Sequence, residues 1–262
     1  MISHKHRSVF VHIPKCAGQS IETAFLDDLG LNWESRGALL LRPNDCPSIG
    51  PPRLAHLIAR DYVRCHHLSK NLFDDYCVFT VVRNPWARTV SLYRYLDNNE
   101  SFSDFVLKRL TKSLATGETD EDFWFFRPQT DYTTDTHGKT IVDRIIKFEE
   151  LENEFSNLAK EINLIAPLKH VNRSNPGIVR KEKPISNTGY NKPKFATIRR
   201  RCSAVRRQIG LFDRRTTAKD WQNFYDEKTQ SHIAELYASD IETFGYSFKH
   251  QTEASVIQSD RQ

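Results

Sequence analysis

The chain has 262 residues, with 38 Lys or Arg against 33 Asp or Glu and a formal net charge of +5. This length can enclose the core of one α/β domain, which we expect over 1–250, followed by a polar, disordered tail over 251–262. No apolar run approaches the roughly 18 residues that a membrane-spanning helix needs, and residues 9–13 are too short for a secretory signal. The composition therefore favours a soluble, cytoplasmic protein.

The first informative segment is Val-Phe-Val-His-Ile-Pro-Lys-Cys-Ala-Gly-Gln-Ser-Ile at 9–21. We predict a buried strand over 8–13, a Gly-containing loop, and an amphipathic helix over 20–29. Backbone N–H groups converge at such a helix N-terminus and bind anions. Lys15 adds a positive charge, and Ser20 is expected to cap the helix or to donate to an anion oxygen. The alternative is that Lys15 is an ordinary solvated lysine.

The order of residues in this loop excludes two common nucleotide sites. Lys15 precedes Gly18, whereas a nucleotide-triphosphatase loop has its lysine directly after the second glycine. The Gly-x-Gly-x-x-Gly fingerprint of dinucleotide sites is also missing from this turn. We therefore expect an anion that is neither a magnesium triphosphate nor a dinucleotide pyrophosphate.

The next elements in chain order are a Pro-rich loop over 43–52, a helix over 53–64 and a strand over 77–82. The strand is a near-continuous apolar run, as expected for a strand buried on both faces of a parallel sheet. Asn84-Pro85 ends it, and a helix is predicted over 86–97.

Arg83 follows the end of this second strand, where open α/β sheets bind their ligands. Ser91 lies two turns into the following helix. A guanidinium and a hydroxyl together form a reasonable clamp for a phosphate monoester. In the alternative interpretation, Arg83 pairs with a carboxylate and Ser91 is a neutral helix-surface residue.

The remaining elements are predicted as helices over 101–115, 150–163 and 226–242 and a strand over 141–148. The aromatic run Phe123–Phe126 forms either a core edge or the wall of a substrate channel. The stretch over 167–193 is rich in loop-forming residues, which is typical of lids and binding loops.

Two features of composition bear on cofactors and partners. The five cysteines are widely spaced and form neither a disulfide framework nor a zinc pattern, so we expect reduced thiols and no metal. Five arginines lie between Arg199 and Arg207, in a cluster that would attract a polyanion. The alternative is a solvated helix face. Nucleic-acid binding is not favoured, because the cluster has no interleaved aromatic residues and no accompanying motif.

Residues 12–20 and 82–93, read together, resemble the two cofactor-binding elements of sulfotransferases that use 3′-phosphoadenosine 5′-phosphosulfate (PAPS). The likeness is to the carbohydrate branch, with its heparan sulfate 2-O-sulfotransferases, chondroitin and dermatan sulfotransferases, and bacterial relatives. Residues 127–132, 142–151 and 237–248 also look like this family. The resemblance implies an α/β fold with a central parallel sheet flanked by helices, in a P-loop-kinase-like sulfotransferase core.

The resemblance also implies roles for individual residues. The first element would bind the 5′-phosphosulfate and the second the 3′-phosphate, without a metal. The implied cofactor-binding residues are Pro14, Lys15, Cys16, Ala17, Gly18, Gln19, Ser20, Arg83 and Ser91. Cys16 and Gln19 stand where the family often has Thr or another small residue, so backbone donors are expected to make the contacts there.

Sulfuryl transfer requires a base for the acceptor hydroxyl and a positive charge beside the departing phosphate. Lys15 is the expected catalytic cation. His56 is the first choice of base, because relatives in the uronyl 2-O-sulfotransferase group carry a catalytic His between the two elements. His66, His67 and Glu22 are competing candidates, and His12 is expected to support the loop.

The predicted function is transfer of a sulfuryl group from PAPS to a hydroxyl acceptor. The family branch implies that this acceptor is a carbohydrate. A small-molecule or lipid acceptor remains open. One rival is a magnesium-dependent small-molecule kinase, which needs a hydroxyl after the loop lysine that Cys16 does not supply. The other is a non-enzymatic polyanion-binding protein centred on Arg199 to Arg207. The oligomeric state is not predicted.

Overall fold

The computed structural model describes residues 1–96, 99–169 and 218–249. Apart from residues 218–219, these belong to one compact unit, Met1–Asn172 with Asp220–Gln262. The arginine cluster Arg199 to Arg207, Cys202 and the predicted tail lie outside the described residues, as does nearly all of the predicted loop over 167–193. The single domain over 1–250 stays a prediction.

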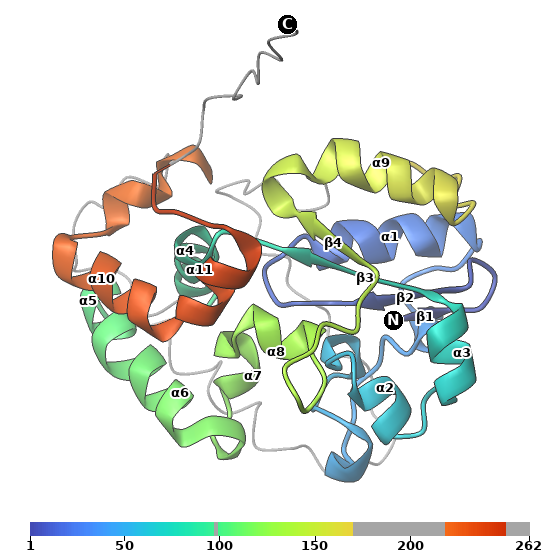
Figure 1. The fold of residues 1–262 in the computed structure, drawn as a ribbon, viewed down its shortest axis with the longest axis horizontal. Coiled ribbons are helices and arrows are strands. Elements are labelled where there is room, and N and C mark those ends of the chain that lie inside the picture. The colour runs from blue at the N-terminus through green and yellow to red at the C-terminus, as the bar shows by residue number, and fades with distance from the viewer. Residues whose placement is uncertain (97–98, 170–217, 250–262) are drawn as a thin grey trace, which may run out of the picture. The chain divides into compact units, whose positions relative to one another are not determined.

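Four strands form one sheet in the order β1-β2-β3-β4 (Figure 1). The strands β2 (Ser8–Val11), β3 (Cys77–Val82) and β4 (Arg144–Lys147) are parallel, whereas β1 (Ile2–Ser3) pairs antiparallel with β2. The central strands β2 and β3 are almost wholly buried, which explains their continuous apolar sequences. The predicted α/β class is confirmed, and the sheet is mostly rather than wholly parallel.

Helices cover both faces of the sheet. On one face lie α1 (Gly18–Asp28) and α9 (Leu151–Glu161), side by side in Figure 1. Their Phe25 and Phe155 rings lie 6.2 Å and 6.4 Å from that of Phe79 on β3. The short helices α2 (Asp61–Arg64) and α3 (Lys70–Asp75) lie on the other side (Figure 1). The main hydrophobic core therefore surrounds β2 and β3.

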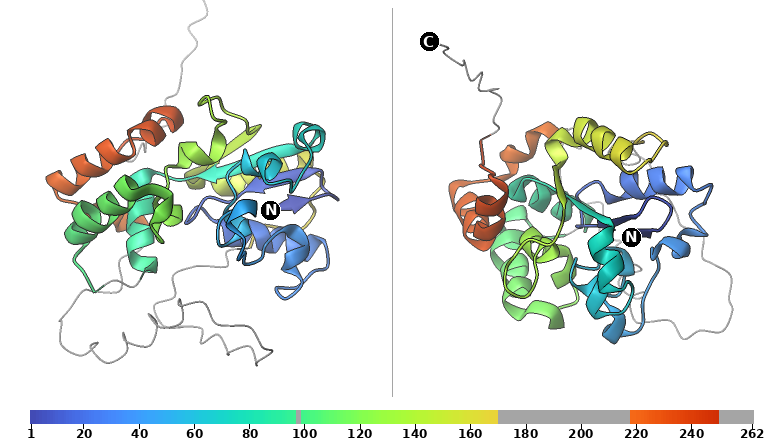
Figure 2. Two further views of the ribbon diagram at one scale, coloured as in Figure 1. Left: turned by 90° about the horizontal axis from the view of Figure 1, so that it is seen from below. Right: turned by 45° about the vertical axis from the view of Figure 1, so that its right-hand side comes forward.

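A group of helices with its own apolar core lies beside the carboxyl end of β3 (Figures 1 and 2). It contains α4 (Pro85–Tyr95), α5 (Phe102–Asp104), the π-helix η4 (Phe105–Leu110), α6 (Thr111–Thr116), α7 (Phe123–Phe126), α8 (Gln129–Thr133), α10 (Glu227–Leu236) and α11 (Ala238–Phe244). Short 3-10 turns complete the described chain, namely η1 (Arg36–Leu39), η2 (Pro47–Ile49), η3 (Leu54–His56), η5 (Gly117–Thr119), η6 (Phe148–Glu150) and η9 (Ala218–Phe224).

Most predicted elements are present, and two differ in an instructive way. The helix predicted over 53–64 is wrong, because only η3 and α2 form there. The Ala59 amide donates to the Tyr132 carbonyl at 3.0 Å, so a tertiary bond replaces a helical one. The helix predicted over 226–242 is divided between α10 and α11 at Tyr237, whose hydroxyl donates to the Phe126 carbonyl at 2.7 Å.

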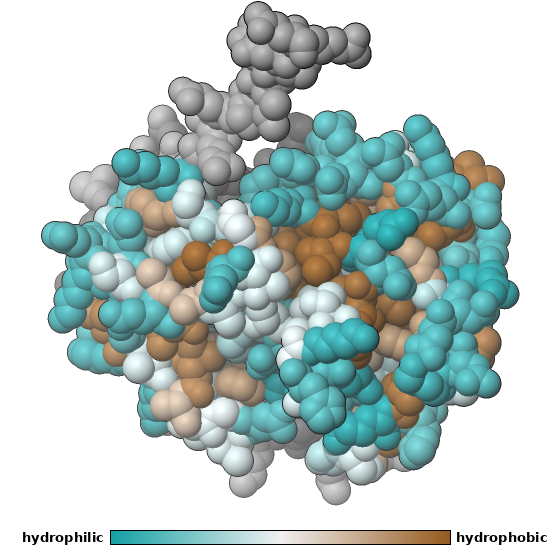
Figure 3. All heavy atoms as spheres, viewed as in Figure 1, coloured by the Kyte–Doolittle hydropathy of each residue, from teal (hydrophilic) through white to brown (hydrophobic). Residues whose placement is uncertain are grey.

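The surface on the side drawn in Figure 3 is hydrophilic over much of its rim, and hydrophobic side chains gather over β4 and the start of α9. Within the described ranges, no helix combines the length and apolar character needed to cross a bilayer.

Candidate functional site

The loop between β2 and α1 has a strained backbone. Lys15 and Ala17 have φ angles of 68° and 60°, a left-handed conformation that residues other than glycine rarely adopt. Helix α1 begins at Gly18, and its N-cap Ala17 provides no side-chain cap. The prediction that Ser20 caps this helix is therefore wrong, since Ser20 lies inside its first turn. Because Ala17 supplies no side-chain oxygen to this helix N-terminus, the position suits an anion.

Gly18 is required by the packing of His12. A Cβ atom on Gly18 would lie 1.8 Å from Nε2 of His12, so a side chain there would displace the imidazole or the loop. The His12 ring is buried and its Nδ1 is 2.7 Å from Oε1 of Glu22 on α1. His12 thus supports the loop, as predicted from the sequence.

Arg83 is held against the loop at the end of β3. Its Nη1 donates to the Lys15 carbonyl at 3.3 Å. Its backbone N–H and carbonyl both bond to the Gln129 amide, at 2.9 Å and 2.8 Å. Nε of Arg83 is buried and has no hydrogen-bond partner within the described chain. A buried, unsatisfied guanidinium N–H is costly unless a ligand accepts from it.

Two positively charged side chains, Lys15 and Arg83, lie at this loop. Nζ of Lys15 lies 4.1 Å from the centre of the Tyr95 ring, and Cζ of Arg83 lies 4.4 Å from that of Phe148. Among the described residues, neither cation forms an ion pair. Burial, together with the nearby charge of Arg83, lowers the pKa of Lys15 to about 8. The arrangement favours binding of an anion that restores the balance of charge.

The Cys16 side chain points into the core. Its thiol is fully buried and donates to Oε1 of Gln129 at 3.4 Å. Burial raises the pKa of Cys16 to about 12, so the thiol stays neutral. The thiol is therefore not available to a ligand, and the backbone N–H of Cys16 donates to the Ile13 carbonyl at 3.3 Å, so contact of Cys16 with a cofactor stays a prediction.

His56 on η3 reaches the same loop through His12. Its Nδ1 lies 3.0 Å from the His12 carbonyl, and the two ring centroids are 4.4 Å apart. Because a carbonyl only accepts, Nδ1 must carry the proton and Nε2 the lone pair. Burial and the proximity of His12 lower the pKa of His56 well below its ordinary value, so its neutral form prevails at neutral pH.

The competing bases are placed differently. Glu22 is buried and bonded to His12. Nε2 of His67 donates to the Ile49 carbonyl at 2.6 Å, and His66 is exposed. Of these candidates, His56 is the one that bonds to the backbone of the loop strand, which leaves its Nε2 unprotonated, and its role as base stays a prediction.

Comparison with known proteins decides the family. A sequence model of the sulfotransferase family matches residues 1–247. The chain belongs to the sulfotransferase family. It is also 31% identical over 99 residues to an uncharacterised protein of Archaeoglobus fulgidus, a match that covers 38% of this chain and 78% of that protein. No solved structure matches the chain. The prediction of a sulfotransferase, and hence of an enzymatic transferase, is confirmed at this level.

Two supporting residues of the sulfotransferase were not identified as such from the sequence. The Gln129 amide joins Cys16 to Arg83, as described above. Arg88 on α4 is fully buried, and its guanidinium donates to the carbonyls of Pro14, Arg127 and Phe125 at 3.2 Å, 3.1 Å and 2.9 Å. Arg88 therefore fixes the loop to helix α7. The sequence did offer one sign of Arg88: it follows Arg83 by five residues, at the start of the helix predicted over 86–97.

The remaining predicted site residues of the sulfotransferase lie on α4 and on the first turn of α1. Ser91 is half-buried in α4, and its hydroxyl makes no hydrogen bond within the described residues. Gln19 is exposed and Ser20 half-buried on the first turn of α1. Their cofactor contacts stay predictions. The described part of the chain contains no cluster of three His, Cys, Asp or Glu that could hold a metal ion.

Proposed function

We propose that this sulfotransferase moves a sulfuryl group from PAPS to a hydroxyl group of a carbohydrate. The observation that carries the proposal is the joining of Arg83 to the carbonyl of Lys15, which brings two cations without ion pairs in the described chain to one place. PAPS carries a phosphosulfate and a separate phosphate, and so presents two anionic groups to such a site. The proposal includes the P-loop-kinase-like arrangement of the core that the resemblance implies.

The residues present fit this donor. The unpartnered Nε of Arg83 supplies a buried donor for phosphate oxygens, with Ser91 as a second donor from α4. Lys15 and the N-terminus of α1, where Ala17 provides no side-chain cap, suit the phosphosulfate end. When bound, PAPS supplies an electrophilic sulfur and a phosphate leaving group.

Each catalytic residue has a separate task. The Lys15 ammonium offsets negative charge that develops on the leaving phosphate. Nε2 of His56 takes the proton of the acceptor hydroxyl, while the His12 carbonyl holds the imidazole in the required tautomer. Arg88 and Gln129 keep the loop and Arg83 in register, so that binding need not reorganise them.

A carbohydrate acceptor is proposed from the likeness to the glycan-modifying branch. The kinase alternative is not favoured, because the residue after the loop lysine is a neutral buried thiol that bonds to Gln129 rather than a hydroxyl placed for magnesium. The polyanion-binding alternative rests on the cluster Arg199 to Arg207, outside the described residues, and predicts salt-sensitive binding that survives loss of Lys15.

Calorimetric binding of 3′-phosphoadenosine 5′-phosphate (PAP) tests the proposal. We expect clear binding to the wild type and a loss of at least about 1.5 kcal/mol in Arg83→Ala, the scale of a charge-assisted hydrogen bond. Lys15→Ala should weaken binding as well. Lys70→Ala and Arg144→Ala remove exposed, ion-paired cations of the same types and should leave the affinity unchanged. Equal affinity in Lys15→Ala, Arg83→Ala and the wild type would contradict the donor assignment.

A further inference from the structure

A strip of three aromatic side chains connects the two proposed catalytic groups. At one end, the Trp124 ring lies 4.9 Å from that of His56. At the other end, the Tyr95 ring lies 4.1 Å from Nζ of Lys15. Between them, the Phe125 ring lies 3.6 Å from the Trp124 ring and 5.8 Å from the Tyr95 ring, measured between centroids. We call Tyr95, Phe125 and Trp124 the aromatic strip.

The aromatic strip is partly open to solvent. Tyr95 is 51% exposed, although large aromatic side chains are usually well buried. Trp124 and Phe125 are half-buried, whereas Phe126 of the same run is fully buried in the helical core. In this run Phe126 belongs to the helical core and Phe125 packs against that core, whereas Trp124 lies beside His56.

The aromatic strip and the loop that carries Lys15 are both hydrogen-bonded to the side chain of Arg88. Nη2 of Arg88 donates to the Phe125 carbonyl, while Nε of the same guanidinium donates to the carbonyl of Pro14. The Tyr132 hydroxyl donates to the Trp124 carbonyl at 2.8 Å. One buried arginine thus holds both the loop that carries Lys15 and helix α7, which carries Trp124 and Phe125 of the strip. Such a preorganised surface is suited to positioning a substrate.

We infer that the aromatic strip is the acceptor subsite of this sulfotransferase and that it binds the ring of a sugar; the inference rests on the proposed function. The reacting hydroxyl must lie within hydrogen-bond reach of His56 and close to the group held by Lys15. The rest of the acceptor must then lie along the strip that joins these two residues.

The openness of the aromatic strip favours a saccharide over an apolar acceptor. A pyranose ring has an apolar C–H face that packs on aromatic side chains, while its outward hydroxyl groups stay hydrated. A phenol or a lipid would instead require a pocket that encloses most of its surface. With Tyr95 half exposed, the strip covers one side of a ligand and leaves the other side in water.

Kinetics of sulfuryl transfer with Trp124→Ala and Trp124→Phe test this inference. The acceptors are cellotetraose and a uronate-containing tetrasaccharide, with 4-nitrophenol as an acceptor that is not a sugar. Trp124→Ala should raise the KM for a saccharide about tenfold, because it removes the largest ring of the strip, and Trp124→Phe should restore most of the loss. The affinity for PAP should stay within about twofold in both variants, since the donor loop is unchanged.

Trp33→Ala is the matched control, because Trp33 is also partly exposed but packs against Arg36. It should leave the KM unchanged. As a readout independent of turnover, saturation transfer from aromatic protons should reach the C–H protons of the saccharide in the wild type with PAP bound, and should be strongly reduced in Trp124→Ala. Unfolding curves establish that the variants are folded.

The inference is overturned if Trp124→Ala keeps both the wild-type KM and the saturation transfer. The proposed function itself is overturned if the wild type does not bind PAP, or if it binds PAP but transfers sulfate to 4-nitrophenol alone or to none of the three acceptors. The two failures are therefore distinguishable.

Discussion

The two ends of helix α1 both carry charge of the sign that the helix dipole disfavours. The N-terminus of a helix has partial positive charge and the C-terminus partial negative charge. Lys15 nevertheless lies in the loop just before α1, and Asp28 is its last residue. The two charged groups differ in their partners within the fold, and this difference separates a structural role from a ligand-binding role.

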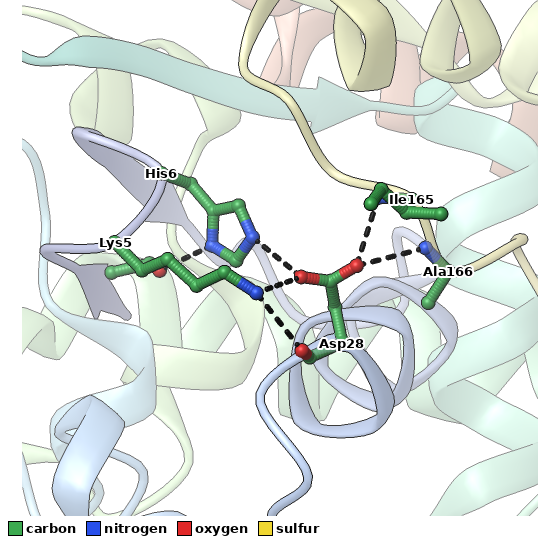
Figure 4. Close-up of polar contacts among 6 residues, drawn as sticks. Lys5, His6, Asp28, Ile165 and Ala166 are labelled. Atoms are coloured by element: carbon green, nitrogen blue, oxygen red, sulfur yellow. Dashed lines mark hydrogen bonds and ion pairs between the residues drawn. The ribbon is translucent and has the colours of Figure 1, made fainter.

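At the C-terminal end, the fold itself satisfies the charge (Figure 4). Asp28 accepts from Nζ of Lys5 at 2.7 Å and is 2.9 Å from Nε2 of His6. Its other carboxylate oxygen accepts from the amides of Ile165 and Ala166, at 2.8 Å and 3.1 Å. The bond from Lys5, with help from the other three donors, holds the pKa of Asp28 well below its ordinary value. This cluster ties the turn between β1 and β2 to the segment after α9.

At the N-terminal end, comparable compensation is missing from the described residues. Lys15 rests on an aromatic ring, and Arg83 donates to a carbonyl rather than to a carboxylate. The strained backbone of Lys15 and Ala17 adds to the cost of this arrangement. A structural role alone explains the Asp28 cluster. The close placement of Lys15 and Arg83, by contrast, becomes energetically favourable only when an anion binds between them.

Removing Asp28 should test the structural half of the comparison. Asp28→Ala leaves donors on two segments, among them the buried His6 ring, without their carboxylate acceptor. It is expected to lower the free energy of unfolding by about 3 kcal/mol, measured by denaturant titration. The affinity for PAP should stay within about twofold. Asp74→Ala, which removes an exposed partner of Lys70, is the control and should change stability by less than about 0.5 kcal/mol.

The pH dependence of this effect has a definite sign. Because the pKa of Asp28 is lowered in the folded state, its contribution is complete above the ordinary value of 3.8 and is lost as the pH falls through the folded value. The stability difference between Asp28→Ala and the wild type should therefore shrink in acid. If Asp28→Ala had normal stability but no longer bound PAP, Asp28 would serve ligand binding rather than the fold, contrary to the role assigned to it.

Replacing His56 sharpens the comparison at the N-terminal end. His56→Ala should lower kcat about 100-fold, the lower range for loss of a general base, while the affinity for PAP is unchanged. Because its pKa is lowered by burial and by His12, His56 stays neutral well below pH 6.5, so the wild-type rate should not fall until the pH is more acidic. His66→Ala provides the matched control. A near wild-type rate in His56→Ala would remove His56 as the base.

The sequence predicts the sheet and the strand, loop and helix over residues 8–28 well, for a local reason. Runs of apolar residues mark β2 and β3, and the ends of parallel strands share one edge of a sheet. That is enough to bring Lys15 and Arg83 together. The prediction of a helix over 53–64 is wrong because the spacing of apolar residues cannot reveal the tertiary hydrogen bond between the Ala59 amide and the Tyr132 carbonyl.

The supporting residues escape prediction because their partners are distant in the sequence. Gln129 bonds to Arg83 across 46 residues, and Arg88 reaches the Pro14 carbonyl across 74. These contacts are made to backbone atoms, which carry no residue-specific signal. The need for glycine at position 18 is equally hidden, since it arises from the side chain of His12 rather than from the backbone conformation of Gly18.

The smallest expected effect is a proton taken up when the anion binds. The pKa of Lys15 is lowered to about 8 in the free protein, and a bound phosphate favours the ammonium and raises it. PAP affinity should therefore be full below pH 8 and decline above it, by at most tenfold per pH unit for one proton. Calorimetry near pH 8 in buffers of different ionisation enthalpy measures the uptake directly. Lys15→Arg, which stays charged, should show neither the uptake nor the decline. If the wild type behaved like Lys15→Arg, Lys15 would not be the charge that the anion compensates, and the contrast with Asp28 would fail.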